Sequence, residues 1–172
     1  MKIVVVSDTH GNMSFIDKIT KMHKDADLFL HAGDSCLDAD SLLPFISVAG
    51  NCDEYISVFS RIFDVENHRI YLMHGSGAYH TPEELVRICK GNMCDIIIYG
   101  HSHIPFYEYY DGVYMLNPGS PIYPRGGHPT YAVMEISGDK VNVEIIKYED
   151  FNSDCIIDIL SNDIKYDNCI IP

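Results

Sequence analysis

Side chains that can bind a metal ion or move a proton recur at one kind of place in this sequence, directly after a short run of apolar residues. The eight such residues are Asp8, His10, Asp34, Asn51, Asp53, His74, His101 and His103. Most of them lie close to a glycine, as the stretches SDTHG, GNCD and GHSH illustrate. Each one alone has an ordinary explanation, such as a helix cap or a turn. Eight such donors, each after a run of apolar residues, rarely arise by chance.

The donor types indicate which ions they would bind. Imidazole together with carboxylate, and without thiolate, suits Mn²⁺, Fe²⁺, Co²⁺, Ni²⁺ or Zn²⁺. Eight donors are too many for one such ion, but they fit two ions that share a carboxylate, about 3.5–4 Å apart as in two-metal hydrolases. In GHSH the rings of His101 and His103 lie on the same side of an extended chain. The residues alone leave open which donor binds which ion.

The apolar pattern predicts the elements that must position these donors. Strands are expected over 2–7, 27–31, 45–49 and 95–99, a hairpin over 57–65 and 68–73, helices over 13–24, 38–43 and 81–92, and further hairpins with turns at 111–112 and 138–139. Alternating strands and helices followed by hairpins indicate an α/β protein with a mixed sheet, and favour two packed sheets. Because loops at the carboxyl ends of strands converge in such folds, five loops would bring the donors together.

Length and composition restrict the class of protein. The 172 residues fit a single domain over 1–172, in which 149–172 is an acidic C-terminal extension whose structure the pattern does not define. No run of 18 apolar residues occurs, and the four-residue apolar run near the N-terminus is too short for a signal peptide. We therefore expect a cytoplasmic protein whose six cysteines are free thiols.

The charge balance restricts the partners. The formal net charge is −13, and the few Lys and Arg residues are scattered. A protein that binds long nucleic acid normally presents a basic face to the phosphates. We therefore expect neither long nucleic acid nor a membrane as a partner, while a homo-oligomer stays open.

The order D-x-H, G-D, G-N-x-D, H-G and G-H-x-H resembles that of the calcineurin-like metallophosphoesterase superfamily. The later stretch NPGSPIYPR, together with the short length, resembles the small prokaryotic phosphodiesterase branch of that superfamily. This branch shares its fold with the small metallophosphoesterase-like subunit of retromer. The resemblance runs from about residue 2 to residue 147. It implies a four-layer α/β/β/α sandwich, in which two mixed β-sheets face each other between helices.

The resemblance also implies a set of metal ligands and a reaction. One divalent ion would be held by Asp8, His10, Asp34 and His103, and the other by Asp34, Asn51, His74 and His101. Asp34 would bridge the two ions. Mn²⁺ is the ion we expect, with Fe, Ni, Co and Zn as alternatives. A hydroxide bridging the ions would attack phosphorus in line with the leaving oxygen, because the ions lower the pKa of bound water.

Position 52 departs from the pattern of many superfamily members, in which the third motif reads G-N-H-D or G-N-H-E. That histidine is thought to protonate or support the leaving group, whereas here the residue is Cys52. General acid assistance is worth typically 10²–10⁴-fold, and a thiol of ordinary pKa is a poor substitute. We therefore expect activity on activated diesters. Cys52 is either weakly catalytic or a small residue that fills the position, and Asp53 would orient a ligand or a water.

Contacts to substrate are expected from the segment after the 111–112 hairpin and from Asn51. Asn117, Gly119 and Ser120 would place amides and a hydroxyl near the site, and Arg125 would bind a phosphate through two hydrogen bonds. A purely structural turn explains the same residues equally well. Among the remaining histidines, His31 is the best candidate to support a metal ligand, because it precedes Asp34 by three residues.

The function that fits best is a metal-dependent phosphoric diester hydrolase acting on small phosphodiesters. A non-catalytic metal-binding scaffold, like the retromer subunit, is an alternative, although such a scaffold tends to lose ligands and none is lost here. A phosphomonoesterase is another, which Cys52 argues against. Two-metal amidohydrolases and lactonases usually carry H-x-H on the first strand and use a bridging Lys, and this chain has neither feature.

Overall fold

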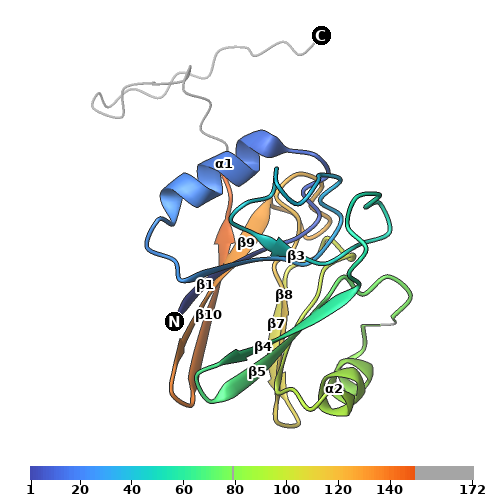
Figure 1. The fold of residues 1–172 in the computed structure, drawn as a ribbon. Coiled ribbons are helices and arrows are strands. Elements are labelled where there is room, and N and C mark those ends of the chain that lie inside the picture. Colours follow the sequence, from blue (N-terminus) through green and yellow to red (C-terminus); the bar gives the residue numbers. More distant parts are fainter. Residues whose placement is uncertain (79, 150–172) are drawn as a thin grey trace, which may run out of the picture.

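The computed structural model describes residues 1–78 and 80–149, which form two five-stranded sheets packed face to face (Figure 1). The first sheet has the order β10-β9-β1-β2-β3 and consists of β1 (Lys2–Val6), β2 (Leu28–His31), β3 (Ile46–Ser47), β9 (Thr130–Ser137) and β10 (Lys140–Lys147). Its strands β1, β2 and β3 are parallel, and β9 runs antiparallel to both β1 and β10. The sheet is therefore mixed.

The second sheet has the order β4-β5-β6-β8-β7 and consists of β4 (Ser60–Val65), β5 (His68–Met73), β6 (Ile96–Ile98), β7 (Phe106–Tyr110) and β8 (Val113–Asn117). Its centre is parallel, because β6 runs in the same direction as β5 and β8. The two edge strands β4 and β7 are antiparallel to their neighbours. This sheet is mixed as well.

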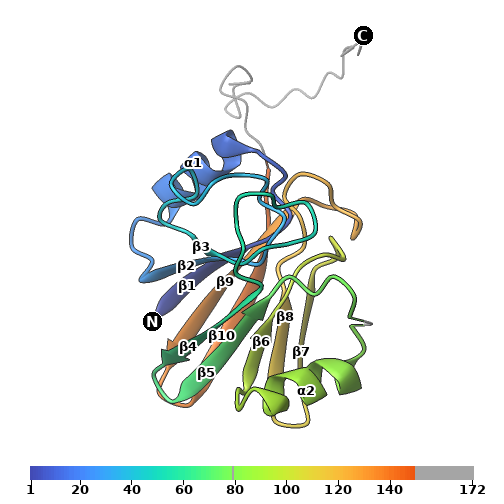
Figure 2. The ribbon, with the colours of Figure 1, turned by 45° about the vertical axis from the view of Figure 1, so that its right-hand side comes forward.

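Three apolar layers hold the molecule together. Side chains alternate along β1, so that Val5 points into the core between the sheets and Val4 points to the outer face. Helix α1 (Met13–Met22) covers that outer face with Phe15 and Ile19. Helix α2 (Pro82–Gly91) covers the outer face of the second sheet with Leu85 (Figure 2). The described chain is thus the α/β/β/α sandwich that the sequence predicts.

Both helices begin where the capping residues predict. The side chain of Asn12 accepts a hydrogen bond from the Phe15 amide at 2.8 Å, and that of Thr81 accepts one from the Glu84 amide at 3.3 Å. Each bond satisfies an amide that has no partner inside the helix. Pro82 occupies the first helical turn, where its missing N–H costs nothing.

The helix expected over 38–43 is wrong, since this segment consists of turns. The Asp38 carboxylate accepts bonds from both the amide and the hydroxyl of Ser41, and Pro44 closes the segment. Proline disfavours helical backbone at the residue before it, so the stretch is too short for a helix.

Two expected strands are each three residues shorter than predicted, whereas the strands expected over 2–7, 27–31 and 95–99 lose only one or two residues. The strand expected over 45–49 is reduced to β3, because the Ala49 amide donates to the Val58 carbonyl at 2.6 Å and the chain leaves the first sheet. The strand expected over 57–65 begins only at Ser60. Apart from Glu149, the predicted extension 149–172 lies outside the described residues.

The parallel strands determine where the site forms. The loops after β1, β2 and β3 leave the first sheet at the carboxyl ends of these parallel strands. The loops after β5 and β6 leave the second sheet toward the same end of the sandwich (Figure 2). These five loops carry the eight donors that the sequence singled out. The carboxyl ends of parallel strands therefore converge as expected.

Candidate metal centre

Five of the eight donor residues have left-handed backbone. The φ angles are 54° at Asp8, 44° at His10, 56° at Asp34, 65° at His101 and 58° at His103. Residues with a side chain rarely adopt this conformation, and each instance costs on the order of 1–3 kcal/mol and persists only where its surroundings hold it. Hydrogen bonds between neighbouring loops do so here, such as Asp8 N to Gly33 O and His10 N to Asp34 O, both at 3.0 Å. Strain of this kind is typical of functional sites.

The first group of converging donors contains Asp8, His10 and His103. Nδ1 of His103 donates to the carbonyl of Tyr123 at 2.7 Å, so in the neutral ring Nε2 carries the lone pair. This Nε2 lies 3.2 Å from Oδ1 of Asp8 and 3.5 Å from Nε2 of His10. Asp8 Oδ1 is buried without a hydrogen-bond partner. The lone pairs of Asp8 Oδ1 and His103 Nε2 repel each other unless a proton or a metal ion lies between them.

The second group has the same arrangement. Nδ1 of His74 donates to the Ala32 carbonyl at 2.8 Å, which leaves Nε2 facing Asp34 Oδ2 at 3.4 Å and Asn51 Oδ1 at 3.2 Å. The ring of His101 packs edge-on against the His74 ring, with centroids 5.1 Å apart.

The charges in the second group also favour a cation. Burial lowers the pKa of His74, but the hydrogen bonds to Asp34 and Ala32 and the nearby carboxylates outweigh it and raise the pKa overall. Nε2 of His74 therefore needs a positive partner, which is either a proton or a metal ion.

Asp34 connects the two groups. Its carboxylate lies with Asp8 and His74 in one set of donors, and with His10 and Cys52 in another, and the donor atoms within each set are all within 4.8 Å of one another. Burial raises the pKa of Asp34, but hydrogen bonds from His74 and from the Cys52 amide hold it well below its usual range. Asp34 is thus charged and has the position that a shared ligand requires.

Asp53 contacts the loops rather than the cavity. Its Oδ2 accepts bonds from the amides of Asp34 and Gly50, both at 2.8 Å, and its Oδ1 accepts bonds from the Ser35 hydroxyl at 2.8 Å and the Cys36 amide at 2.7 Å. These four bonds tie the loop after β3 to the loop after β2. Asp53 therefore positions Asp34 and Asn51, and it does not line the cavity.

His31 also joins two of the loops that carry donor residues. Its Nδ1 accepts from the Gly33 amide at 3.1 Å, so Nε2 carries the proton and donates to the Thr9 hydroxyl at 2.8 Å. Complete burial lowers the pKa of His31 to about 4, which keeps the ring neutral. The ring connects the loops that carry Asp8 and Asp34 without pointing at either carboxylate.

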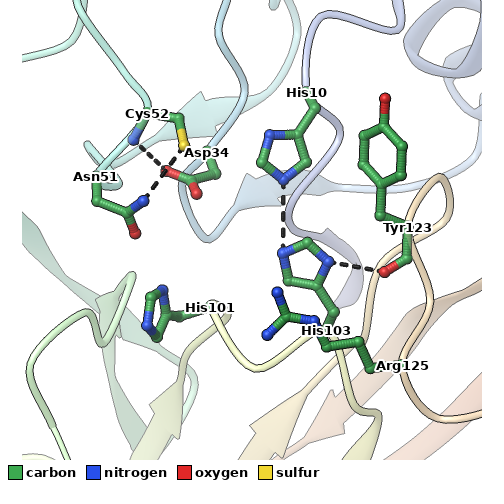
Figure 3. Close-up of a pocket in the computed structure, with 8 residues that line it drawn as sticks. All are labelled: His10, Asp34, Asn51, Cys52, His101, His103, Tyr123 and Arg125. Atoms are coloured by element: carbon green, nitrogen blue, oxygen red, sulfur yellow. Dashed lines mark hydrogen bonds between the residues drawn. The ribbon is translucent and has the colours of Figure 1, made fainter.

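The donors surround an open cavity of about 430 Å³ (Figure 3). Its lining consists of His10, Asp34, Asn51, Cys52, His101, His103, Tyr123 and Arg125. Cys52 is exposed at the mouth, and partial burial together with the Asp34 carboxylate raises the pKa of its thiol to about 11. At neutral pH this thiol is uncharged and a far weaker acid than an imidazolium.

Three residues predicted to contact substrate lie elsewhere. The amide of Asn117 donates to the Gly100 carbonyl and the Ser102 hydroxyl, and the Ser120 hydroxyl donates to the Asp8 carbonyl at 2.8 Å. Gly119 is buried with them, and none of the three lines the cavity. The prediction of direct contact is therefore corrected for Asn117, Gly119 and Ser120, of which Asn117 and Ser120 hold the donor loops in place. Asn51 and Arg125 do line the cavity.

The sequence did not single out Tyr123, although it lies within the NPGSPIYPR stretch. Its carbonyl accepts the His103 bond, and its ring meets the His10 ring edge-on at 5.3 Å between centroids. The signal that could have found it is its place two residues before Arg125, which the sequence predicts to contact substrate. Its exposure at the cavity can be read only from the folded chain.

Comparisons with known proteins identify sequences and structures to which the chain is similar. A family model described as the calcineurin-like phosphoesterase superfamily domain matches residues 1–139. The chain is 34% identical over 159 residues to a probable metallophosphoesterase of Methanothermobacter thermautotrophicus, covering 86% of this chain and 92% of the relative. It is 26% identical to the phosphodiesterase YfcE of Escherichia coli K12, covering 78% of this chain and 88% of that protein.

A solved structure of similar shape is that of Vacuolar Protein Sorting 29 from Cryptosporidium parvum, with a TM-score of 0.73 at 19% identity, covering 87% of this chain and 92% of the other. At that identity the likeness concerns the fold alone. Within residues 1–78 and 80–149, no helix is long and apolar enough to span a membrane.

Proposed function

The chain belongs to the calcineurin-like phosphoesterase superfamily, and from this premise we propose that it hydrolyses small phosphodiesters with two divalent metal ions. The observation that carries the proposal is the pair of converging donor groups, above all the buried oxygen Asp8 Oδ1, which has no hydrogen-bond partner and faces Nε2 of His103. Burial raises the pKa of Asp8, because an unpaired buried charge is costly, and a bound cation would offset that cost.

The proposed ligands follow from the two groups. Asp8, His10, Asp34 and His103 would hold one ion, and Asp34, Asn51, His74 and His101 the other, with Asp34 shared. Ions bound in such a site lower the pKa of water and stabilise negative charge on phosphoryl oxygens. With imidazole, carboxylate and amide donors, Mn²⁺ is the ion we expect, and Fe, Co, Ni and Zn suit the same donors.

The other residues of the cavity have supporting tasks. Arg125 faces the cavity and would bind a phosphoryl oxygen with its guanidinium. Asp53 keeps the loops of Asp34 and Asn51 in register through its four hydrogen bonds. Cys52 cannot protonate a leaving group as an imidazolium would, since the pKa of its thiol is raised to about 11. This favours diesters whose leaving groups need no proton.

The similarity to the phosphodiesterase YfcE supports diesters over monoesters. A cytoplasmic location stays a prediction, and the free thiols of Cys36, Cys52, Cys89 and Cys94 are in line with it. That long nucleic acid is not a partner also stays a prediction. The likeness in fold to Vacuolar Protein Sorting 29 keeps a non-catalytic scaffold as the second reading. The complete set of donors argues against it.

The test is to strip the protein with chelator, restore Mn²⁺, and compare the rates with bis-p-nitrophenyl phosphate and p-nitrophenyl phosphate. We expect metal-dependent turnover with the diester preferred. Asp8→Asn should reduce that turnover at least about 100-fold, because loss of an outer hydrogen-bond partner of a metal ligand already costs 10–100-fold.

The control is Asp64→Asn, an exposed carboxylate on β4 that pairs with Arg69, and it should leave the rate unchanged. Equal or better turnover of the monoester would contradict the diester preference. Bound metal without turnover of either ester would favour the scaffold.

A further inference from the structure

Two large apolar side chains are exposed beside the cavity. Tyr123, which lines it, is 59% exposed, and Ile104, which directly follows His103, is 48% exposed. Exposed apolar groups scattered singly are ordinary, but neighbouring ones at the rim of a polar site indicate a binding surface. We refer to Tyr123 and Ile104 together as the rim.

The rim is fixed to a metal-ligand candidate before any substrate binds. The imidazole of His103 donates to the Tyr123 carbonyl at 2.7 Å, and the Arg125 amide donates to the His103 carbonyl at 3.0 Å. The Tyr123 amide donates to the Ser120 hydroxyl at 2.9 Å. The ring of Tyr123 and the guanidinium of Arg125 thus project from a segment whose backbone is held on both sides. A preorganised surface loses little freedom when it binds.

The same segment lies against Ile104. A Cβ placed on Gly126 would be 2.5 Å from Cδ of Pro105 and 3.6 Å from Cγ2 of Ile104, so glycine allows the two stretches to touch. Ile104 therefore lies against the segment that carries Tyr123 and Arg125, although 19 positions separate Ile104 from Tyr123 in the sequence.

The cavity next to the rim suits a phosphoryl group. Arg125 is the only Lys or Arg among the described residues that line it, and Figure 3 shows its side chain among those that surround the cavity. The Tyr123 ring stands beside His10 and meets it with an edge, which leaves much of the ring uncovered. Planar aromatic groups bind such a ring by offset stacking or edge contacts.

We propose that the rim binds a planar aromatic ring of the substrate while Arg125 contacts its phosphoryl group. The substrate class is then a phosphoester carrying an aryl group or a nucleobase, and not a purely aliphatic one. This inference rests on the proposed function, because it needs the phosphoryl group to reach the metal centre. It adds the part of the substrate that the metal ions do not contact.

Binding of phosphonates tests the inference without relying on turnover, because their C–P bond is not hydrolysed as an ester. Calorimetry with the Mn²⁺-loaded protein would compare methylphosphonate, phenylphosphonate and a nucleoside 5′-phosphonate. We expect at least one aromatic ligand to bind about 10-fold more tightly than methylphosphonate, which is within the usual range for ring stacking. Tighter binding of the nucleoside compound identifies a base as the ring, and tighter binding of phenylphosphonate alone identifies a simple aryl group.

Variants separate the rim from the metal centre. Tyr123→Ala should reduce the aromatic preference to less than about 3-fold, and Tyr123→Phe should retain it, since the ring face is what binds. The affinity for methylphosphonate should stay the same in both, because the bond to His103 comes from the backbone carbonyl. Tyr109→Ala is the matched control: Tyr109 is 58% exposed but lies on β7 and does not line the cavity.

Equal affinities for the aromatic and methyl ligands in the wild-type protein would overturn the inference, as would a preference that survives Tyr123→Ala. Failure of the proposed function looks different. A protein that prefers aromatic phosphonates but hydrolyses no ester would support the binding role of the rim and contradict the proposed hydrolase activity.

Discussion

Cys52 occupies the position at which a histidine could act as a general acid. Its amide donates to Asp34 Oδ1 at 2.8 Å, and its sulfur accepts from the Asn51 side chain at 3.2 Å. The backbone of Cys52 therefore supports Asp34 whatever its side chain does. The side chain itself faces the cavity and can be exchanged without losing that bond.

Replacing this thiol by imidazole should change which esters react. We expect Cys52→His to accelerate esters with poor leaving groups, such as alkyl phosphodiesters, by as much as about 10²-fold, the lower end of general acid assistance. Esters with a p-nitrophenolate leaving group need no proton and should change little. Steady-state rates on both kinds of diester measure the effect.

Cys52→Ser is the control, because a hydroxyl is no better an acid than this thiol at neutral pH. A uniform acceleration of all esters by Cys52→His would indicate a change in metal binding instead of proton transfer.

At the scale of elements, the site depends on contacts between loops that belong to different strands. Asp53 joins the loop after β3 to the loop after β2, and His31 joins the loop after β2 to the loop after β1. The expected helix over 38–43 shows the limit of local patterns, since an Asp38 turn and Pro44 prevail there. The long helices and strands were predicted correctly because their apolar periodicity spans several turns or pairs.

Asp53→Asn tests the first of these contacts. An amide offers only one acceptor oxygen and turns its NH₂ group toward donors, so two of the four bonds are lost. We expect metal affinity to fall about 10–100-fold and the free energy of unfolding to fall by about 2–3 kcal/mol. Mn²⁺ titration and urea denaturation measure the two effects.

Asp38→Asn is the matched control, because this carboxylate also accepts bonds within a loop, from Ser41, but does not touch the site. Unchanged metal affinity in Asp53→Asn would mean that the four bonds do not position the ligands.

His31 predicts a pH dependence of stability. Its pKa in the folded chain is lowered by burial to about 4, against 6.5 in the unfolded chain. Between these values the unfolded chain binds a proton that the folded chain does not. The free energy of unfolding is therefore highest above pH 6.5 and decreases as the pH falls toward 4. The loss from this residue is about 3 kcal/mol.

Urea denaturation in chelator at pH 7 and pH 4.5 measures the pH effect in the wild type and in His31→Gln, which cannot titrate. The decrease should be smaller in His31→Gln, whereas the exposed His128→Gln should behave as the wild type does. An equal decrease in all three proteins would exclude His31 as its source.

At the scale of the whole molecule, two sheets share one end and one cavity. The donors come from both sheets, since Asp8, Asp34 and Asn51 follow strands of the first and His74 and His101 follow strands of the second. Ions bound between them would join the two sheets. Binding to the folded chain alone stabilises it by mass action.

Metal removal should therefore lower the melting temperature. An ion present at 100 times its dissociation constant contributes about 2.7 kcal/mol, and 1 kcal/mol shifts Tm by about 2–4 °C in a chain of this length. We expect chelator to lower Tm by about 5–10 °C, measured by calorimetry, and Mn²⁺ to restore it. In Asp8→Asn the shift should be much smaller, and an equal shift in that variant would argue against Asp8 as a ligand.

The sequence by itself determined the kinds of donor and their places at strand ends, because both depend on neighbours along the chain. Apolar periodicity indicated an α/β protein with packed sheets, and the resemblance in its motifs implied the layered α/β/β/α architecture. Which nitrogen of His74 and His103 faces the centre was decided only by carbonyls 42 and 20 residues away, at Ala32 and Tyr123.

Tertiary structure also decided which polar residues reach the cavity. Ser120 looks like a substrate contact in the sequence, yet its hydroxyl is taken by the Asp8 carbonyl 112 residues away. Tyr123 looks like any loop tyrosine, yet its fold places the ring beside His10. A side chain's direction and free hydrogen-bonding capacity depend on segments that meet only when the two sheets pack, and no local pattern records them.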